Sequence, residues 1–183
     1  MDLRIQKTKS AVRNAFLELR RKKPVEKITV TELAKLAEIN KATFYLHYSD
    51  IYSLAEEIED EMIDSILSGL HELDKFFDDP KKYTSELLNA FMINRHMLTT
   101  VFSGSRYSCF SDKVEKRIKS RLYGEFPELS SRHNDIVLSF VIQGTFHTIA
   151  AGVPDNSAAD DEIEVITRLT DCLYSELERP ANS

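Results

Sequence analysis

The chain has 183 residues, of which 42% are hydrophobic, and its formal net charge is −6. This is enough apolar sequence to bury a core, in one domain or in a small domain plus a larger one. No stretch approaches the roughly 20 apolar residues of a membrane span and no apolar run follows the first residues, which argues against a membrane protein and predicts no secretory signal.

The predicted elements are helical from the start. The chain holds only five glycines and five prolines and has no long alternation of apolar and polar residues, which predicts an all-α fold. A first helix is expected from about Ile5 to Lys22, and Pro24 ends it. Its apolar residues recur on one face, which we expect to be buried: Val12, Ala15, Phe16 and Leu19.

Two short helices follow with almost no linker between them. Thr29 is placed to cap the first, and Glu32, three residues later, completes a capping box. The chain turns over Glu38 and Ile39, and Asn40 is a favourable cap for the second helix. Two helices joined by such a tight turn can set the second one in a DNA major groove, which is about 12 Å wide.

The later helices are longer. Ser49 and Asp50 form a capping pair that is expected to start a fourth helix, and the run Asp78, Asp79 and Pro80 is expected to end it. Further helices are expected at about residues 83–102, 107–123, 133–152 and 157–178. Gly and Pro residues lie in or beside the breaks between these segments, as is typical of helix ends.

The net charge is unevenly distributed along the chain. Residues 1–50 hold 11 Lys and Arg against 6 Asp and Glu, a balance of +5, which leaves 13 against 24, or −11, for residues 51–183. A basic head on an acidic body suits a protein that approaches phosphates with one part only. A merely solvated basic helix would give the same asymmetry, and the two short helices favour the nucleic-acid interpretation.

The two short helices resemble the N-terminal domain of the tetracycline-repressor (TetR) family of regulators. The resemblance lies in the run Ile-Thr-Val-Thr-Glu-Leu-Ala at 28–34, the turn Ala37-x-Ile39-Asn40, and the run Thr-Phe-Tyr-Leu-His-Tyr at 43–48. It covers roughly residues 5–60. It implies a three-helix helix-turn-helix domain at residues 1–48 and a larger helical dimerisation and ligand-binding domain at 49–183, with about nine helices in all.

The function implied by this resemblance is sequence-specific DNA binding by a transcriptional regulator. The expected form is a cytoplasmic homodimer that represses at a double-stranded DNA operator and is released by a small apolar or amphipathic effector. No cofactor or metal is expected. An activator, or a helical adaptor that works through a protein partner without an effector, is the alternative.

The resemblance also assigns the expected DNA contacts. Lys41 can donate to guanine, and Ala42 can pack against a thymine methyl. Side chains expected to bind phosphate oxygens and fix the register include hydroxyls, an imidazole and lysines of the first helix. The expected DNA-binding residues are Lys7, Thr29, Thr31, Lys41, Ala42, Thr43, Tyr45 and His47, with Lys9 as a further candidate. Phe44 is expected in the core, and core packing is an alternative for Tyr45.

Two positions depart from the family pattern. Position 38 is usually Gly, and here it is Glu38; if the backbone there needs a positive φ, a non-Gly residue costs on the order of 1 kcal/mol. Its carboxylate also brings negative charge near the duplex. A Lys is common just inside the fourth helix, where this chain has Ile51, so one phosphate contact is in doubt.

The body is expected to supply a dimer interface and an effector pocket. The last two helices would pair with those of a second copy through Phe140, Gly144, Ala151, Ile166, Leu169 and Leu173. An ordinary intramolecular core would show a similar pattern. The pocket is expected to be lined by Met62, Ile66, Phe91, Asn94, Leu98, Phe140 and His147, although Asn94 and His147 could instead be satisfied within the protein.

An enzyme is the least favoured class. The sequence has no His-Glu-x-x-His, no Cys-x-x-Cys, no Gly-rich phosphate loop and no Gly-x-Ser-x-Gly elbow. Cys109 and Cys172 stand alone without metal-ligand spacing, which fits a reducing cytoplasm, although a redox-sensing pair is the alternative.

Overall fold

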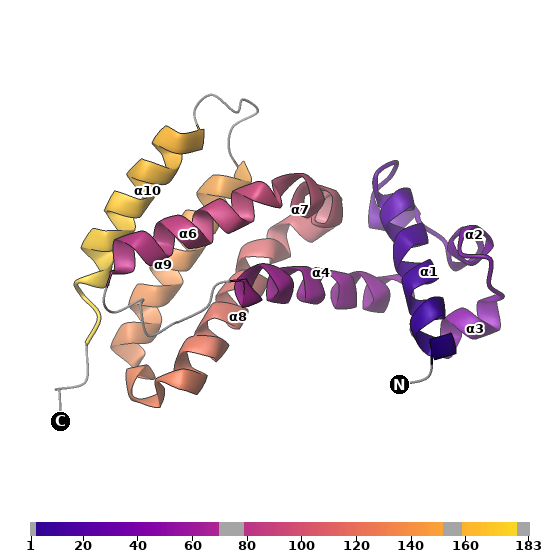
Figure 1. The fold of residues 1–183 in the computed structure, drawn as a ribbon, viewed down its shortest axis with the longest axis horizontal. Helices are drawn as coiled ribbons and strands as arrows, with labels where there is room; N and C mark the ends of the chain where they lie inside the picture. Colours follow the sequence, from indigo (N-terminus) through magenta and orange to yellow (C-terminus); the bar gives the residue numbers. More distant parts are fainter. Residues whose placement is uncertain (1–2, 70–78, 152–158, 179–183) are drawn as a thin grey trace. The chain divides into compact units, whose positions relative to one another are not determined.

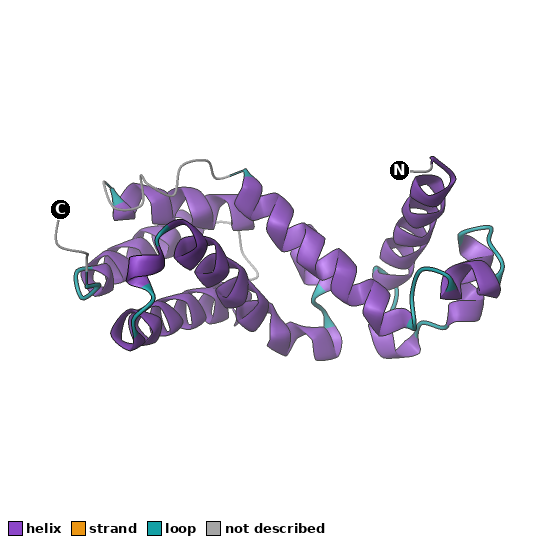
Figure 2. Cartoon of the chain, turned by 90° about the horizontal axis from the view of Figure 1, so that it is seen from below, coloured by secondary structure: helices purple, strands orange, loops and turns teal. Residues whose placement is uncertain are grey.

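The computed structural model describes residues 3–69, 79–151 and 159–178, and it places them in helices joined by short loops. The described residues hold no strand, so the all-α prediction is confirmed for them (Figure 2). Their α-helices are α1 (Leu3–Arg20), α2 (Val30–Leu36), α3 (Lys41–Tyr45), α4 (Ile51–Ser68), α6 (Pro80–Ile93), α7 (Arg95–Val101), α8 (Phe110–Glu125), α9 (Arg132–Ala151) and α10 (Ala159–Tyr174). Three 3₁₀ turns, η1 (Val25–Lys27), η2 (Gly104–Cys109) and η3 (Pro127–Leu129), complete the set.

The chain divides into two compact units. The first comprises Met1–Met62 and His96–Ser108, and the second comprises Ile63–Arg95 and Cys109–Ser183. The division falls inside α4, so the first unit extends past the boundary at residue 48 that the resemblance implies, and it includes a segment from much later in the chain.

The core of the first unit is built by α1, α2 and α3, which succeed one another in the ribbon (Figure 1). The apolar stripe of α1 is buried as its spacing predicts, with Val12 and Phe16 fully inaccessible. Leu33 of α2 and Phe44 of α3 meet the same core at 0% exposure, which confirms the core prediction for Phe44. These side chains fix the short helices, because helices of seven and five residues are too short to be stable alone.

Arg20 holds the late segment in the first unit. It is the last residue of α1, only 3% exposed, and its Nη2 donates to the carbonyls of Val101 and Ser103 at 2.8 and 3.0 Å. Both acceptors lie at or just beyond the end of α7, where a helix leaves carbonyls unsatisfied. Burial lowers the pKa of Arg20 from its usual value, but guanidinium groups stay protonated in proteins.

A second buried charge ties η2 to α4. Glu59 is fully inaccessible, and Arg106 donates to its two carboxylate oxygens through Nε and Nη2, both at 2.6 Å. Such a two-pronged pair fixes orientation as well as distance. Two arginines therefore hold residues 96–108 to the rest of the first unit. Arg20 of α1 donates to carbonyls of the segment, and Arg106 of the segment donates to a carboxylate of α4.

The second unit pairs its helices two by two. Helix α6 packs along α10, α8 packs along α9, and α9 also meets α10 (Figure 1). An aromatic cluster lies in its core, with the Phe91 ring 4.6 Å from Phe146 and 6.0 Å from Phe110, centroid to centroid. Lys119 of α8 reaches Asp135 of α9 at 2.6 Å and so adds a polar clamp between the same two helices.

Two expected helix boundaries are wrong. The segment expected as one helix at 83–102 is two, because α6 ends at Ile93 and Asn94 leaves helical geometry before α7 begins. The run Asp78, Asp79 and Pro80 was expected to end the fourth helix, but Asp79 and Pro80 begin α6, and Asp78 lies outside the described residues. Asp79 Oδ1 accepts the Lys82 amide at 3.0 Å, and Pro80 occupies the first turn. An Asp-Pro pair suits a helix start because Pro needs no hydrogen-bond acceptor there.

Removing the arginine of the buried pair should destabilise the protein strongly. For Arg106→Leu we expect the free energy of unfolding to fall by about 3–5 kcal/mol, because the inaccessible Glu59 carboxylate loses its two-pronged partner. Urea denaturation followed by circular dichroism measures this loss. The control is Lys22→Leu, which breaks the exposed Lys22–Glu18 pair and should change stability by less than about 1 kcal/mol. Equal effects of the two changes would contradict the role given to Arg106.

Candidate nucleic-acid interface

The caps of α2 and α3 form as the sequence predicts. Thr29 Oγ1 accepts the Glu32 amide at 3.2 Å, and Asn40 Oδ1 accepts the Thr43 amide at 2.7 Å. Each cap satisfies an amide that the helix itself leaves without a partner. Four residues, 37–40, separate the two helices. The start of each helix is fixed by its own cap.

None of the side chains expected to contact DNA is buried in the core. Most of these side chains are exposed, and Thr43 and His47 are half-buried: Lys7, Thr29, Thr31, Lys41, Ala42, Thr43, Tyr45 and His47. Tyr45 is 56% exposed, so the alternative that it packs in the core is wrong. Leu46 is 80% exposed beside it, which adds an apolar side chain that the sequence did not single out.

The hydroxyls of Thr29 and Thr43 differ in whether they are available to donate a hydrogen bond to DNA. Thr29 Oγ1 accepts a hydrogen bond in capping α2, so its own hydrogen is available to donate to a phosphate oxygen. The Thr43 hydroxyl instead donates to Asn40 Oδ1 at 2.9 Å. Thr43 can therefore donate to a phosphate only after giving up that bond, whereas Thr29 needs no rearrangement.

Lys7 and Lys9 of α1 differ in whether they form an ion pair within the protein. Lys9 Nζ lies 3.0 Å from Glu57 Oε1 and 5.6 Å from the centre of the Tyr48 ring. Tyr48 donates to the same Glu57 oxygen at 2.9 Å, and burial together with this carboxylate raises the pKa of Tyr48. Lys9 therefore helps to fix the end of the Thr43–Tyr48 run, while Lys7 makes no ion pair with any described residue.

The turn between α2 and α3 contains a strained residue. Glu38 has φ of 54°, and it is the one non-glycine residue with positive φ in the described part of the chain. An L-residue pays about 1–2 kcal/mol for this conformation, which Gly would adopt freely. Position 38 therefore has the positive φ at which a non-glycine residue is strained. Its side chain is exposed, so nothing in the core offsets the strain.

Ile51 cannot replace the missing lysine at the start of α4. It is the first residue of that helix and only 6% exposed, so its side chain belongs to the core. The helix start itself is well formed: Asp50 Oδ1 accepts the Ser53 amide at 2.7 Å, and the Asp50 amide donates to Ser53 Oγ at 3.2 Å. The predicted capping role of Asp50 is confirmed.

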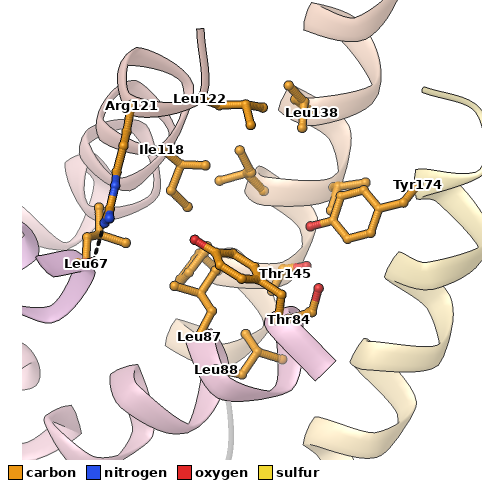
Figure 3. A pocket seen from close by; sticks show the side chains of 14 residues that line it. Leu67, Thr84, Leu87, Leu88, Ile118, Arg121, Leu122, Leu138, Thr145 and Tyr174 are labelled. Carbon is orange, nitrogen blue, oxygen red and sulfur yellow. Dashed lines mark hydrogen bonds between the residues drawn. The ribbon is translucent and has the colours of Figure 1, made fainter. Parts of the chain in front are cut away.

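The residues expected to line an effector pocket are divided between the two units, and none of them lines the cavity of the second unit. Met62 and Leu98 are buried in the first unit, and Ile66 and Phe91 in the second. The other three side chains are exposed instead: Asn94, Phe140 and His147. Asn94 donates to the Ala90 carbonyl at 2.8 Å, which is the local satisfaction given as its alternative. The second unit does contain a cavity, but different residues line it (Figure 3).

The residues expected at a dimer interface fall into two groups. Phe140 and Leu169 are 68% and 58% exposed, and nothing lies within 4 Å of the place where a Cβ on Gly144 would stand. Ile166 is buried in its own unit at 9% exposure, and Leu173 is half-buried, so these two pack largely within the chain. The side chain of Ala151 lies outside the described residues.

No family model and no curated protein matches the chain. Among the described residues, no helix is long and apolar enough to cross a membrane, and no group of three or more His, Cys, Asp or Glu side chains is placed to hold a metal ion. The assignment of function therefore rests on the geometry of α2, α3 and their supports.

Sequence reasoning missed the charges that support this surface. Arg20 continues the four-residue spacing of Val12 and Phe16, which places it on the buried face of α1. Glu59 follows Ala55 at the same spacing on α4. A charged residue on a buried stripe needs a partner. The spacing of Arg20 and Glu59 in the sequence therefore predicts that each has one, but it does not predict which residue the partner is.

Replacing Glu38 by glycine should stabilise the protein. For Glu38→Gly we expect the free energy of unfolding to rise by about 0.5–1 kcal/mol, because relief of the positive φ outweighs the greater freedom of glycine in the unfolded chain. The measurement is urea denaturation. Glu38→Ala, which removes the charge but keeps the strain, is the control and should not stabilise. If alanine stabilised as much as glycine, charge rather than backbone strain would explain the gain.

Proposed function

We propose that this chain is a sequence-specific DNA-binding transcriptional regulator that acts as a homodimeric repressor and is released by a small molecule. The observation that carries the proposal is the pair of capped short helices, α2 and α3, with Lys41, Ala42 and Tyr45 exposed on α3. A helix presented in this way suits insertion in a major groove, with its first residues towards the base edges.

The charges of the first unit support contact with phosphates at selected points. Lys9 and Arg13 are each paired with a carboxylate of α4, and Lys23 is paired with Glu32. Lys7 and Lys41 have no such pairing among the described residues, so they keep their charge for a polyanion. Few phosphate contacts imply a shallow dependence of affinity on salt, since each neutralised phosphate contributes about −0.9 to the slope of log K against log salt.

Two copies are needed because one short helix offers little surface for selective binding. A two-fold dimer would present two such helices to successive major grooves. Exposed apolar side chains on the last two helices support this arrangement, with Ile136 and Phe140 one turn apart on α9 and Val165 and Leu169 one turn apart on α10. These four side chains are 45–68% exposed, and the open space at Gly144 continues the same face of α9.

An adaptor that binds a protein through the first unit is the second candidate. Leu36, Tyr45 and Leu46 are 40%, 56% and 80% exposed around α2 and α3, and such side chains suit a protein partner as well as a groove. Salt separates the two: DNA binding weakens as salt rises, and binding through apolar side chains does not.

The first test of DNA binding compares two lysines. The DNA is the intergenic sequence beside the chain's own gene, against random DNA of equal length, followed by fluorescence anisotropy at several salt concentrations. Lys41→Ala should lose about 1–3 kcal/mol on the specific site and relax its preference, whereas Lys7→Ala should weaken both DNAs alike. Equal losses on both DNAs for Lys41→Ala would remove Lys41 from the residues that read bases. Salt-independent binding, or none, would favour the adaptor.

The homodimer is tested at an exposed apolar residue of α10. Leu169→Glu should shift the protein from dimer to monomer in light scattering after size-exclusion chromatography, because two copies of the charge would be buried at the interface. The matched control is Ile93→Glu, which places the same charge at an 83% exposed apolar residue of the same unit, at the end of α6 rather than on α9 or α10. A Leu169→Glu variant that stays dimeric would contradict this interface.

A further inference from the structure

The first unit has an open groove between α1 and the end of α2. Its volume is about 290 Å³, and all of its lining residues belong to this unit. Three of them are small: Ala11 is half-buried, and Ala15 and Ala37 are 4% and 8% exposed. Leu36, which is 40% exposed, is the one large apolar side chain of the lining. The groove is open because alanines stand where larger side chains would fill the space.

The polar side chains of this groove carry negative charge. Asn14, Glu18 and Glu38 complete the lining, and all three are exposed. Glu18 forms an ion pair with Lys22 at 2.8 Å. The Glu38 carboxylate makes no ion pair or hydrogen bond with any residue that the structure describes. The groove is therefore an acidic site on a part of the chain whose overall balance is positive.

Glu38 is also the residue with the strained backbone, at φ of 54°. Glycine would adopt this conformation freely. Strained residues cluster at sites where the strain serves a function. The exposed carboxylate of Glu38 has no partner among the described residues, so nothing within the chain uses it. A positively charged group from outside the chain would give this carboxylate a partner.

The start of α1 has the complementary character. Every side chain from Leu3 to Lys7 is exposed, so the other described residues leave this end of the helix largely uncovered. Leu3 and Ile5 are 72% and 41% exposed, and Arg4 and Lys7 add two positive charges. Leu3 and Lys7 lie one turn apart, on the same side of the helix. An apolar side chain with a cation one turn later suits a groove that is lined by alanines and bordered by carboxylates.

A copy cannot place its own start of α1 in its own groove. Leu3 and Ala11 belong to one helix, which holds them about 12 Å apart along its axis. We propose that the start of α1 docks in this groove on a second copy, with Leu3 against the alanines and Lys7 beside Glu38. The two surfaces differ, so the contact is heterologous and can join copies in a row. It is therefore a different contact from the two-fold dimer.

This contact competes with DNA, and that consequence rests on the proposed function. Lys7 is expected to bind phosphate, and it cannot pair with Glu38 of another copy at the same time. The phosphates of a duplex and the carboxylates of the groove therefore attract the same cation. Copies that are not on DNA associate through the groove, and added DNA reverses this association.

Sedimentation velocity of the full chain without DNA tests the contact. A contact of this size is weak, so the protein is measured up to its highest soluble concentration. The mean mass should rise with concentration above that of the smallest stable species, and salt should reduce the rise. Leu3→Ser should weaken the association roughly tenfold or more, because the leucine no longer buries its apolar area. Ile93→Ser is the matched control, at a residue of the second unit that is 83% exposed, and should change nothing. No association of the unchanged chain, or equal effects of the two changes, would overturn the proposal.

An exchange of charges identifies the ion pair. Lys7→Glu and Glu38→Lys should each weaken the association by roughly threefold or more. The variant with both changes restores opposite charges across the contact and should recover most of the association, which general damage to the fold could not produce. The matched control combines Lys7→Glu with Glu128→Lys, at an exposed residue of the second unit. It has the same net charge and should not recover. A Lys7→Glu and Glu38→Lys double variant that associates no better than this control would overturn the pairing.

The same samples separate this proposal from the proposed function. Added random DNA should reduce the association of the unchanged chain, because phosphates take up Lys7. If the protein binds no DNA but the charge exchange behaves as expected, the contact stands and the regulator proposal fails. If DNA binds but copies do not associate, the contact alone fails. Association that is unchanged by bound DNA would overturn the competition at Lys7.

Discussion

The first unit depends on the satisfaction of two buried charges by a segment far away in the sequence. Arg20 ends α1 and takes the carbonyls of Val101 and Ser103, and Arg106 returns to the inaccessible carboxylate of Glu59 on α4. An uncompensated buried charge costs several kcal/mol, so neither contact is optional for this packing. Helices α1, α2 and α3 are thus held by residues 96–108 as well as by their own core.

Carboxylates of α4 also determine which basic side chains of α1 are paired within the unit. Glu57 and Glu61 take Lys9 and Arg13 of α1, and these pairs position the helix rather than a ligand. The positive balance of the first 50 residues is therefore partly used inside the unit, and the charge left for a polyanion is concentrated at a few side chains. A surface of this kind would depend on groove contacts from α3 more than on general attraction to phosphate.

Local features were predictable from the sequence, and distant pairings were not. The caps at Thr29, Asn40 and Asp50 and the buried stripe of α1 follow from residue types within one or two turns, and all of them form. The split at Asn94 was missed because apolar spacing continues across it, and the true cavity was missed because its wall combines several helices. The DNA contacts, the dimer and the effector stay predictions.

The placement of residues 96–108 in the first unit has a consequence for how the protein can be divided. A fragment that ends with α4 would carry Arg20 and Glu59 without Val101, Ser103 and Arg106. It would keep the short helices and their caps but leave both buried charges to water or to each other. The head is therefore not an autonomous folding module that can be cut out at a linker, and a graft of it onto another protein would have to carry the later segment as well.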